Sequence, residues 1–435
     1  MSKTKVIHLG PEIKGLTELL GKDFEIFDVP LEMVNRPIGE EKKRLFIKGE
    51  LNLFFRHDLF LITQSEYLES EQSAILRQLP ANSIVIDERL NLSAEAIKAL
   101  RLKNAQFISF QNEQELAKLL KEVFYNDQLG FKYNFDNIQF DPFFKGTVKQ
   151  LGHNYLEIID NDIEEYQRVA NWDGPIGVGK DALWEIHTEF KRNTPTTNVR
   201  LRVSLINTST AQVYYSVEVD NDDLKNEIPL EINDNGTLIL AELLVKGKDI
   251  DLTMGAITAN EGRDGRGTLL IGEDMAIDDE AMGEPLYHYF DPGDFKPPLM
   301  VYFSGFRFNP GVEGMYMMRG LKGPSLLIED FRILGGSFYV GGKKLESQII
   351  NLIQSTLKKL GFKPNELILS GLSMGTFASL YYSSFLNPDW VIVGKPLTSL
   401  GDIAANERIN RPSTFPTSLD VVLRLTGGIA DENIK

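Results

Sequence analysis

The stretch Glu366 to Tyr382 constrains the fold more than any other part of this chain. A run of apolar residues leads into Gly371-x-Ser373-x-Gly375, and helix-forming residues follow. A strand, a sharp turn and a helix in this order are what a nucleophile elbow requires. The two glycines lack a Cβ, so strand and helix can pack closely around a strained serine. We therefore predict that Ser373 is a catalytic nucleophile; the alternative is that it only caps the helix.

A serine nucleophile needs donors for the oxyanion that forms during acyl transfer. The backbone N–H of Met374 begins the predicted helix and is the first candidate. In hydrolases of this kind the second donor comes from the loop after an earlier strand. Here that loop begins Ser304-Gly305-Phe306, and the N–H of Phe306 is the candidate. The alternative is a simple turn between strand and loop.

Composition excludes several classes of protein. The chain has 435 residues, 42% hydrophobic and 25% charged, as expected for a soluble globular protein. Its net charge of −16 disfavours binding to nucleic acid or an anionic membrane. There is no cysteine, which excludes disulfides, thiolate metal sites and a cysteine nucleophile. We find no histidine pair at helical spacing, and so predict no metal and no cofactor.

No signal peptide and no apolar run of about 18 residues is present, so we expect no transmembrane segment and a cytoplasmic location. Three domains are predicted. Residues 1–130 alternate strand-like and helix-like segments, which is typical of an α/β domain with a mostly parallel sheet. They contain no Gly-x-Gly-x-x-Gly and no phosphate loop.

Residues 140–284 are predicted to form a β-sandwich, because short alternating runs are separated by turn residues. Trp172, Trp184, His187 and Tyr214 either form a sugar-stacking platform or fill the core of this sandwich. A carbohydrate-binding role is therefore an open alternative for this domain. Residues 260–284 are acidic and rich in glycine, and we predict a long surface loop there.

Residues 285–435 are predicted to form an α/β-hydrolase-like domain with a parallel sheet. Strands are expected at 299–306 and 325–330, a helix at 343–360, then the elbow, and a last strand at 389–394. Gly361 and Pro364 end the predicted helix.

A serine hydroxyl also needs a base, and on this fold the acid and the histidine follow the serine. All five histidines precede Ser373, and His288 is the upstream histidine best placed for recruitment. Five acidic residues do follow Ser373: Asp402, Glu407, Asp420, Asp431 and Glu432. Either the acid and the histidine lie beyond Lys435, or an upstream histidine is recruited, or the serine is unassisted.

Six short stretches between residues 300 and 420 together resemble one family. They are Tyr302–Phe306, Glu313–Met318, Gly335–Tyr339, Leu369–Thr376, Gly394–Leu397 and Phe415–Asp420. As a set they are similar to the second accessory secretory protein of the accessory Sec system of Gram-positive bacteria. The rest of the chain fits that family's three-part layout more loosely.

The resemblance implies a cytosolic protein, or one peripheral to the membrane translocon, that acts in export of serine-rich glycoprotein adhesins. Its implied partners are the first and third accessory Sec proteins, the accessory SecA motor and the adhesin. It further implies O-acetylation of the adhesin's N-acetylglucosamine residues by a Ser–Glu–His triad. Only the serine maps onto this chain, as Ser373, and the family's acid and histidine are expected beyond Lys435. The acetyl donor is not implied.

Two other functions stay open. One is a non-catalytic scaffold of the accessory Sec translocon with a vestigial hydrolase domain. The other is a plain esterase, which would turn over small aryl esters without preferring a sugar acceptor.

Overall fold

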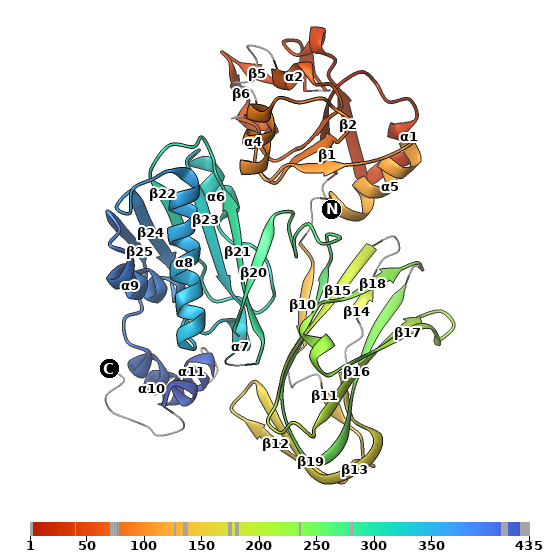
Figure 1. Cartoon of the computed structure of the whole chain (residues 1–435), viewed down its shortest axis with the longest axis vertical. Coiled ribbons are helices and arrows are strands. Elements are labelled where there is room, and N and C mark those ends of the chain that lie inside the picture. Colours follow the sequence, from red (N-terminus) through yellow and green to blue (C-terminus); the bar gives the residue numbers. More distant parts are fainter. Residues whose placement is uncertain are drawn as a thin grey trace.

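The computed structural model describes residues 3–39, 41–69, 76, 78–125, 128–133, 138–172, 176–178, 182–234, 236–278, 280, 282–409 and 416–426. The chain forms a mixed α/β structure with three large sheets, which follow one another along the sequence. Each sheet is the centre of a separate body of the molecule (Figure 1). We call them the N-terminal, middle and C-terminal sheets.

The N-terminal sheet has five strands in the order β2-β1-β7-β8-β9, and every pair is parallel. Its strands are β1 (Thr4–Leu9), β2 (Phe24–Asp28), β7 (Leu59–Ile62), β8 (Ile84–Asp87) and β9 (Gln106–Ile108). Successive strand residues point to opposite faces, so Val6 and Leu61 pack with one helix layer while Ile7 and Phe60 pack with the other. The predicted parallel sheet is confirmed.

Helices cover both faces of this sheet. On one face lie α1 (Leu16–Leu20) and α5 (Glu113–Val123), and on the other α2 (Glu66–Glu69) and α4 (Ala94–Leu102). The predicted cap is present at α4, where the Ser93 hydroxyl accepts a hydrogen bond from the Ala96 N–H at 3.2 Å. Four two-residue strands form two small hairpins beside the sheet: β3 (Pro37–Ile38), β4 (Lys43–Arg44), β5 (Phe46–Ile47) and β6 (Glu50–Leu51).

The middle sheet is antiparallel and has ten strands. They are β10 (Gly130–Tyr133), β11 (Ile138–Phe140), β12 (Thr147–Leu151), β13 (Tyr155–Trp172), β14 (Ile176–Val178), β15 (Ala182–Arg192), β16 (Asn198–Asn207), β17 (Gln212–Asp220), β18 (Ile228–Ile232) and β19 (Thr237–Glu261). Hydrogen bonds join all ten strands into one sheet, because the 25-residue β19 pairs with β10, β13, β14, β15 and β16. The β-sandwich stays a prediction.

The aromatic residues of the middle sheet mostly fill its core. Trp172 and Trp184 are 2% and 1% exposed and belong to the apolar cluster of this sheet. His187 is buried as well, with its Nε2 2.9 Å from the Gly283 carbonyl oxygen. Tyr214 alone of the four is exposed. The sugar-stacking alternative is therefore wrong, and the core interpretation is confirmed for three of the four residues.

The C-terminal sheet has the order β20-β21-β23-β22-β24-β25. Its strands are β20 (Glu273–Asp278), β21 (Glu284–Asp291), β22 (Leu299–Phe303), β23 (Ser325–Asp330), β24 (Leu367–Leu372) and β25 (Trp390–Gly394). The last four are parallel, whereas β20 and β21 are antiparallel. Two corrections follow: the sheet is mixed, and the predicted surface loop 260–284 contains the strand β20.

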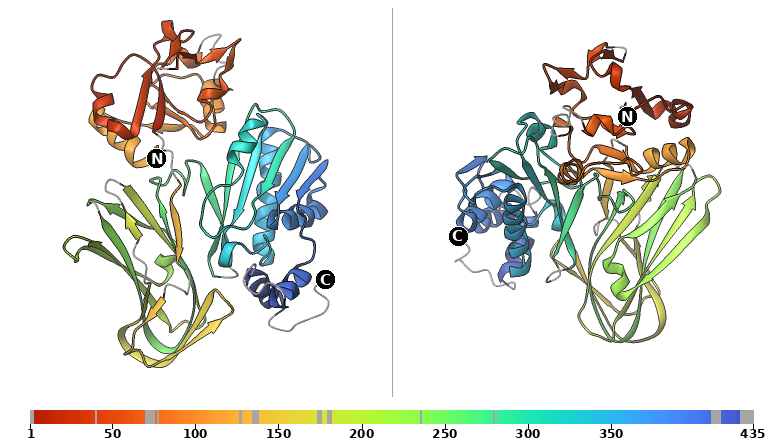
Figure 2. Two further views of the ribbon diagram at one scale, coloured as in Figure 1. Left: turned by 180° about the vertical axis from the view of Figure 1, so that it is seen from behind. Right: turned by 45° about the horizontal axis from the view of Figure 1, so that its top comes forward.

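Helices also flank the C-terminal sheet. They are α6 (Met315–Gly320), α7 (Arg332–Gly335), α8 (Lys343–Leu360), α9 (Met374–Leu386), α10 (Leu400–Ile409) and α11 (Pro416–Thr426). α8 has the predicted bounds, and it ends at Gly361 with φ 75°. The side chains of α8 and α9 share one apolar cluster with the sheet, while α6 packs on the opposite face. Figure 2 shows α10 and α11 at the end of this sheet that carries α7. Among the described residues, no helix is long and apolar enough to span a membrane.

Candidate active site

Ser373 occupies a sharp turn between β24, which ends at Leu372, and α9, which begins at Met374. Its backbone has φ 53° and ψ −116°, a conformation that costs a non-glycine residue about 1–3 kcal/mol. Backbone hydrogen bonds hold it there. The Ser373 N–H donates to the Gly394 carbonyl at 2.9 Å, and its carbonyl accepts from the Thr376 N–H at 3.0 Å.

The Ser373 side chain does not cap α9. Its hydroxyl also has no hydrogen-bond partner among the residues that the structure describes. The capping interpretation is therefore wrong, since a capping serine bonds to an N–H of the first helical turn. The strain and the unpaired hydroxyl are what a nucleophile elbow would show, and catalysis by Ser373 stays a prediction.

The two glycines of the motif are required by close backbone approaches. A Cβ on Gly371 would lie 2.2 Å from the Gly375 carbonyl oxygen. A Cβ on Gly375 would lie 2.0 Å from the carbonyl oxygen of Phe303, the last residue of β22. The start of α9 therefore lies directly against the end of β22.

The loop after β22 reaches Ser373, as the proposed oxyanion site needs. A Cβ on Gly305 would lie 4.0 Å from the Ser373 Cβ and 3.5 Å from the Leu372 carbonyl oxygen. The next residue, Phe306, packs its ring against Gly335 and edge-on against Phe308. Met374 is fully buried beside Gly336. Phe306 and Met374 thus belong to the two segments that meet at Ser373, and their role as N–H donors stays a prediction.

A carboxylate that the sequence analysis missed lies at the same place. Glu313 Oε2 accepts the Gly305 N–H at 2.8 Å, and the Glu313 N–H donates to Glu329 Oε1 at 2.9 Å. Glu329 is fully buried, and this burial raises its carboxyl pKa well above the ordinary value. Glu313 therefore fixes the loop that carries Phe306. Glu313 opens one of the six stretches that resemble the family, but nothing in that stretch indicates a contact with Gly305, so only the fold could show it.

His288 does not lie near Ser373. It is on β21, and β23 and β22 stand between β21 and β24. Through the paired residues Ile328 and Phe303 it is in register with Gly371. Three strand spacings separate the two positions by about 14 Å, far beyond hydrogen-bond reach. Recruitment of His288 as the base is therefore excluded in this arrangement.

The acid Asp420 has another partner. Its carboxylate accepts the His153 N–H at 3.1 Å and the Asn154 side-chain amide at 2.7 Å, and Oδ1 lies 3.1 Å from His153 Nδ1. These residues form the turn between β12 and β13, so Asp420 joins α11 to the middle sheet. The side chain of Asp402 is exposed on α10. Asp431, Glu432 and the Glu407 side chain lie outside the described residues.

The remaining histidines have structural partners. His8 lies 2.5 Å from Asp28 and 2.8 Å from Thr63 at the carboxyl end of the N-terminal sheet. His57 contacts Arg319. Over the described ranges, no group of three or more His, Asp or Glu side chains could hold a metal ion.

Comparison with known proteins gives consistent matches. The family model described as the accessory Sec system GspB-transporter, or accessory secretory protein 2, matches residues 4–435. The accessory Sec system protein of this kind from Staphylococcus aureus is 34% identical over 378 residues, which cover 86% of this chain and 72% of that protein. Its counterpart from Streptococcus gordonii is 35% identical over 331 residues, or 76% of this chain and 64% of that protein.

Among solved structures, a chain of the Glycosylation Associate Protein (Gap123) complex from Streptococcus agalactiae matches with a TM-score of 0.82 and 32% identity. The match covers 99% of this chain and 83% of that one. The similarity therefore extends over all three sheets.

Proposed function

The chain belongs to the accessory Sec system GspB-transporter family, and on that premise we propose that it O-acetylates sugar residues of exported serine-rich adhesins. The observation that carries this proposal is Ser373. It is a strained residue between β24 and α9, beside the Gly305 loop, and its hydroxyl has no hydrogen-bond partner in the described part of the chain. We further propose that the C-terminal sheet is α/β-hydrolase-like, since four parallel strands surround this turn.

In the proposed reaction the Ser373 Oγ attacks the acetyl carbonyl of a donor while its proton passes to a base. The N–H groups of Met374 and Phe306 stabilise the oxyanion, and the donor's leaving group departs. A hydroxyl of N-acetylglucosamine then attacks the acetyl-serine and releases Ser373. Glu313 contributes by fixing the Gly305 N–H, which leaves the following N–H of Phe306 as the proposed donor.

The base and its acid are left unassigned in the proposed mechanism, because His288 is three strands away from Ser373 and Asp420 is engaged at the β12–β13 turn. The edge strand β25 also exposes Trp390 (64%) and Ile392 (58%). An uncovered apolar edge of this kind is suited to pairing with a further strand.

The partners of this chain are proposed from its similarity to a solved structure. The match to a chain of the Gap123 complex supports assembly with the first and third accessory Sec proteins. Contact with the accessory SecA motor and the adhesin, and a cytoplasmic location at the translocon, belong to the same proposal.

The test is Ser373→Ala in the protein as its own host produces it. Ser384→Ala is the matched control, because Ser384 is an exposed serine on the same helix. We expect Ser373→Ala to abolish acetylation of the adhesin glycans, measured by mass spectrometry of the released sugars, and Ser384→Ala to leave it intact. Unchanged acetylation in Ser373→Ala would falsify the enzymatic proposal.

A non-catalytic scaffold is the second candidate, favoured by the match to a chain of the Gap123 complex. Export of the adhesin, measured in the same strains, separates the two. Normal acetylation with normal export in Ser373→Ala supports the scaffold. A plain esterase would instead hydrolyse aryl esters equally fast with and without the sugar acceptor.

A further inference from the structure

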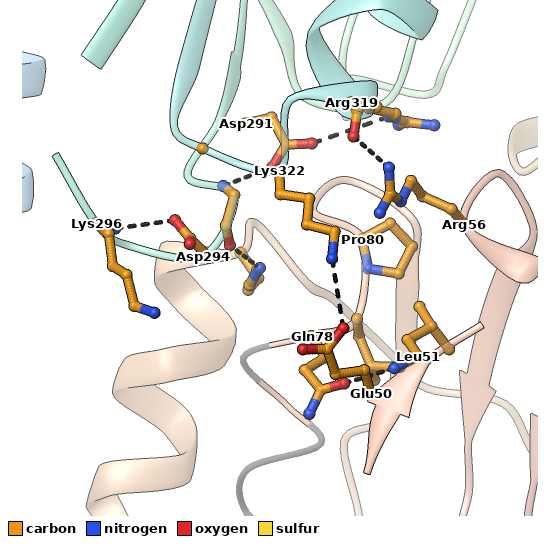
Figure 3. Close-up of a pocket in the computed structure, with 14 residues that line it drawn as sticks. Glu50, Leu51, Arg56, Gln78, Pro80, Asp291, Asp294, Lys296, Arg319 and Lys322 are labelled. Atoms are coloured by element: carbon orange, nitrogen blue, oxygen red, sulfur yellow. Dashed lines mark hydrogen bonds and ion pairs between the residues drawn. The ribbon is translucent and has the colours of Figure 1, made fainter. Parts of the chain in front are cut away.

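A pocket of about 360 Å³ lies where the N-terminal region meets the C-terminal sheet (Figure 3). Five cationic side chains line it: Arg56, Lys103, Lys296, Arg319 and Lys322. Three carboxylates, those of Glu50, Asp291 and Asp294, line it as well. The pocket thus has an excess of two positive charges, in a chain whose net charge is −16.

Arg319 is largely buried, with 8% of its side chain exposed. One terminal nitrogen donates to the Tyr289 hydroxyl at 2.9 Å, and the other lies 3.2 Å from His57 Nδ1. Its Nε makes no hydrogen bond within the described part of the chain. The nearest carboxylate oxygen, Asp291 Oδ2, is 3.9 Å from that Nε. A buried N–H without an acceptor is costly.

Two more cations depend on the same carboxylate. Arg56 donates to the Arg319 carbonyl at 2.5 Å, and burial lowers its pKa while Asp291 opposes that effect. Lys103 donates to the Gly293 carbonyl at 2.6 Å. Burial lowers the pKa of Lys103 to about 8, although the negative charges of Asp291 and Asp294 act to raise it. Three cations thus share the negative charge of Asp291, and a second bound anion would offset the cost of burying all three.

We propose that this pocket binds a small phosphate-bearing metabolite, with its phosphate held between Arg56 and Arg319. The Arg56 guanidinium keeps Nε and Nη2 for a pair of phosphate oxygens, because within the described residues only its Nη1 makes a hydrogen bond. A doubly charged phosphate also matches the excess of two charges. Leu51, Leu79 and Pro80 line the same pocket and offer apolar contacts to the rest of the molecule. The volume falls in the range of small-molecule sites, whereas a folded partner would need a wide, open surface.

The site is distant from the proposed chemistry. Asp291 ends β21, and Lys322 and Gly323 precede β23, so the pocket lies at the opposite end of the sheet from Ser373. Its ligand would therefore join the N-terminal region to the C-terminal sheet and stabilise their contact. This inference does not depend on acetyl transfer.

The test is calorimetric titration of the 435-residue protein with two probes, inorganic phosphate and adenosine 5′-monophosphate, with acetate as the comparison anion. We expect saturable binding of the phosphate probes and a higher melting temperature in their presence. Arg56→Gln should weaken binding at least tenfold. Arg36→Gln, an exposed arginine of the same region, is the matched control and should bind normally.

Lys296→Gln, at the exposed rim of the pocket, keeps the test valid if Arg56→Gln does not fold, and it should weaken binding two- to fivefold. Absence of saturable phosphate binding, or binding that Arg56→Gln and Lys296→Gln leave unchanged, would overturn the proposal. So would tighter binding of acetate than of phosphate, which would point to a carboxylate from a protein partner.

Discussion

At the scale of single residues, the glycine at 375 is imposed by a backbone contact. The space that a Cβ would need at this position is taken by the Phe303 carbonyl oxygen at 2.0 Å, and backbone cannot move aside as a flexible side chain can. We expect Gly375→Ala to lower the free energy of unfolding by about 1–3 kcal/mol. The midpoint of urea unfolding measures this change.

Gly320→Ala is the control for that measurement. Gly320 is also helical, at the end of α6, but a Cβ there would meet no heavy atom within 4 Å. The free energy of unfolding of Gly320→Ala should differ from that of the unaltered protein by no more than about 0.5 kcal/mol. Equal effects at both positions would show that the start of α9 does not lie directly against the end of β22.

The turn at Ser373 could be predicted because its determinants lie within five consecutive residues. The carboxylate of Glu313 could not, because its contact with Gly305 depends on how the loop after β22 folds back. The same holds for Asp420, whose partner His153 is 267 residues away in sequence. Local motifs thus reveal the turn at Ser373, whereas the groups that surround it are brought together only by the fold.

At the scale of elements, predictions succeeded where apolar periodicity was strong. The helix α8 buries Leu345, Ile349, Ile353 and Leu357 at helical spacing, and its bounds were predicted correctly. The strand β20 was missed because its buried residues are charged. Asp278, for example, is fully buried and lies 3.4 Å from the equally buried Arg332. A charged strand resembles a surface loop when its ion-pair partner is distant in sequence.

The helix α11 should depend on Asp420 for its attachment to the β12–β13 turn. Asp420→Ala removes the acceptor of two hydrogen bonds from His153 and Asn154, and buried charged bonds of this kind contribute about 1.5–3 kcal/mol each. We expect hydrogen exchange to become faster at residues 152–154 and 416–426. Asp402→Ala, at an exposed position of α10, should leave both segments protected. Unchanged exchange in Asp420→Ala would contradict this attachment.

At the scale of the whole molecule, buried carboxyl groups should make stability depend on pH. Burial raises the pKa of Glu185 to about 8 and that of Glu273 to about 7, and it also raises the pKa of Glu329 well above its ordinary value. In the unfolded chain these groups titrate near pH 4.3. Between that pH and their raised values the folded protein binds more protons than the unfolded one, so stability falls as the pH rises.

Other titratable side chains change the stability of the protein at lower pH. Carboxylates that arginine neighbours hold at a lowered pKa, such as Asp87 and Asp220, add stability that is complete above about pH 5. Burial lowers the pKa of His187, because the folded state favours the neutral imidazole. The stability that this group contributes is complete above pH 6.5, the ordinary pKa of histidine in an unfolded chain. Burial lowers the pKa of Lys103 to about 8, so this group makes stability rise with pH above that value. The decline is therefore best measured by urea unfolding between pH 6.5 and 8.

Glu273→Gln tests the origin of this decline, because glutamine has nearly the same shape and does not titrate. We expect its stability to fall less steeply with pH than that of the unaltered protein. Glu231→Gln, at an exposed position of β18, should keep the original slope. If the unaltered protein shows no decline, or if Glu273→Gln shows the same slope, Glu273 must be ionised in the folded state. In that case the positive charge of the buried Arg263 outweighs the desolvation of this carboxylate.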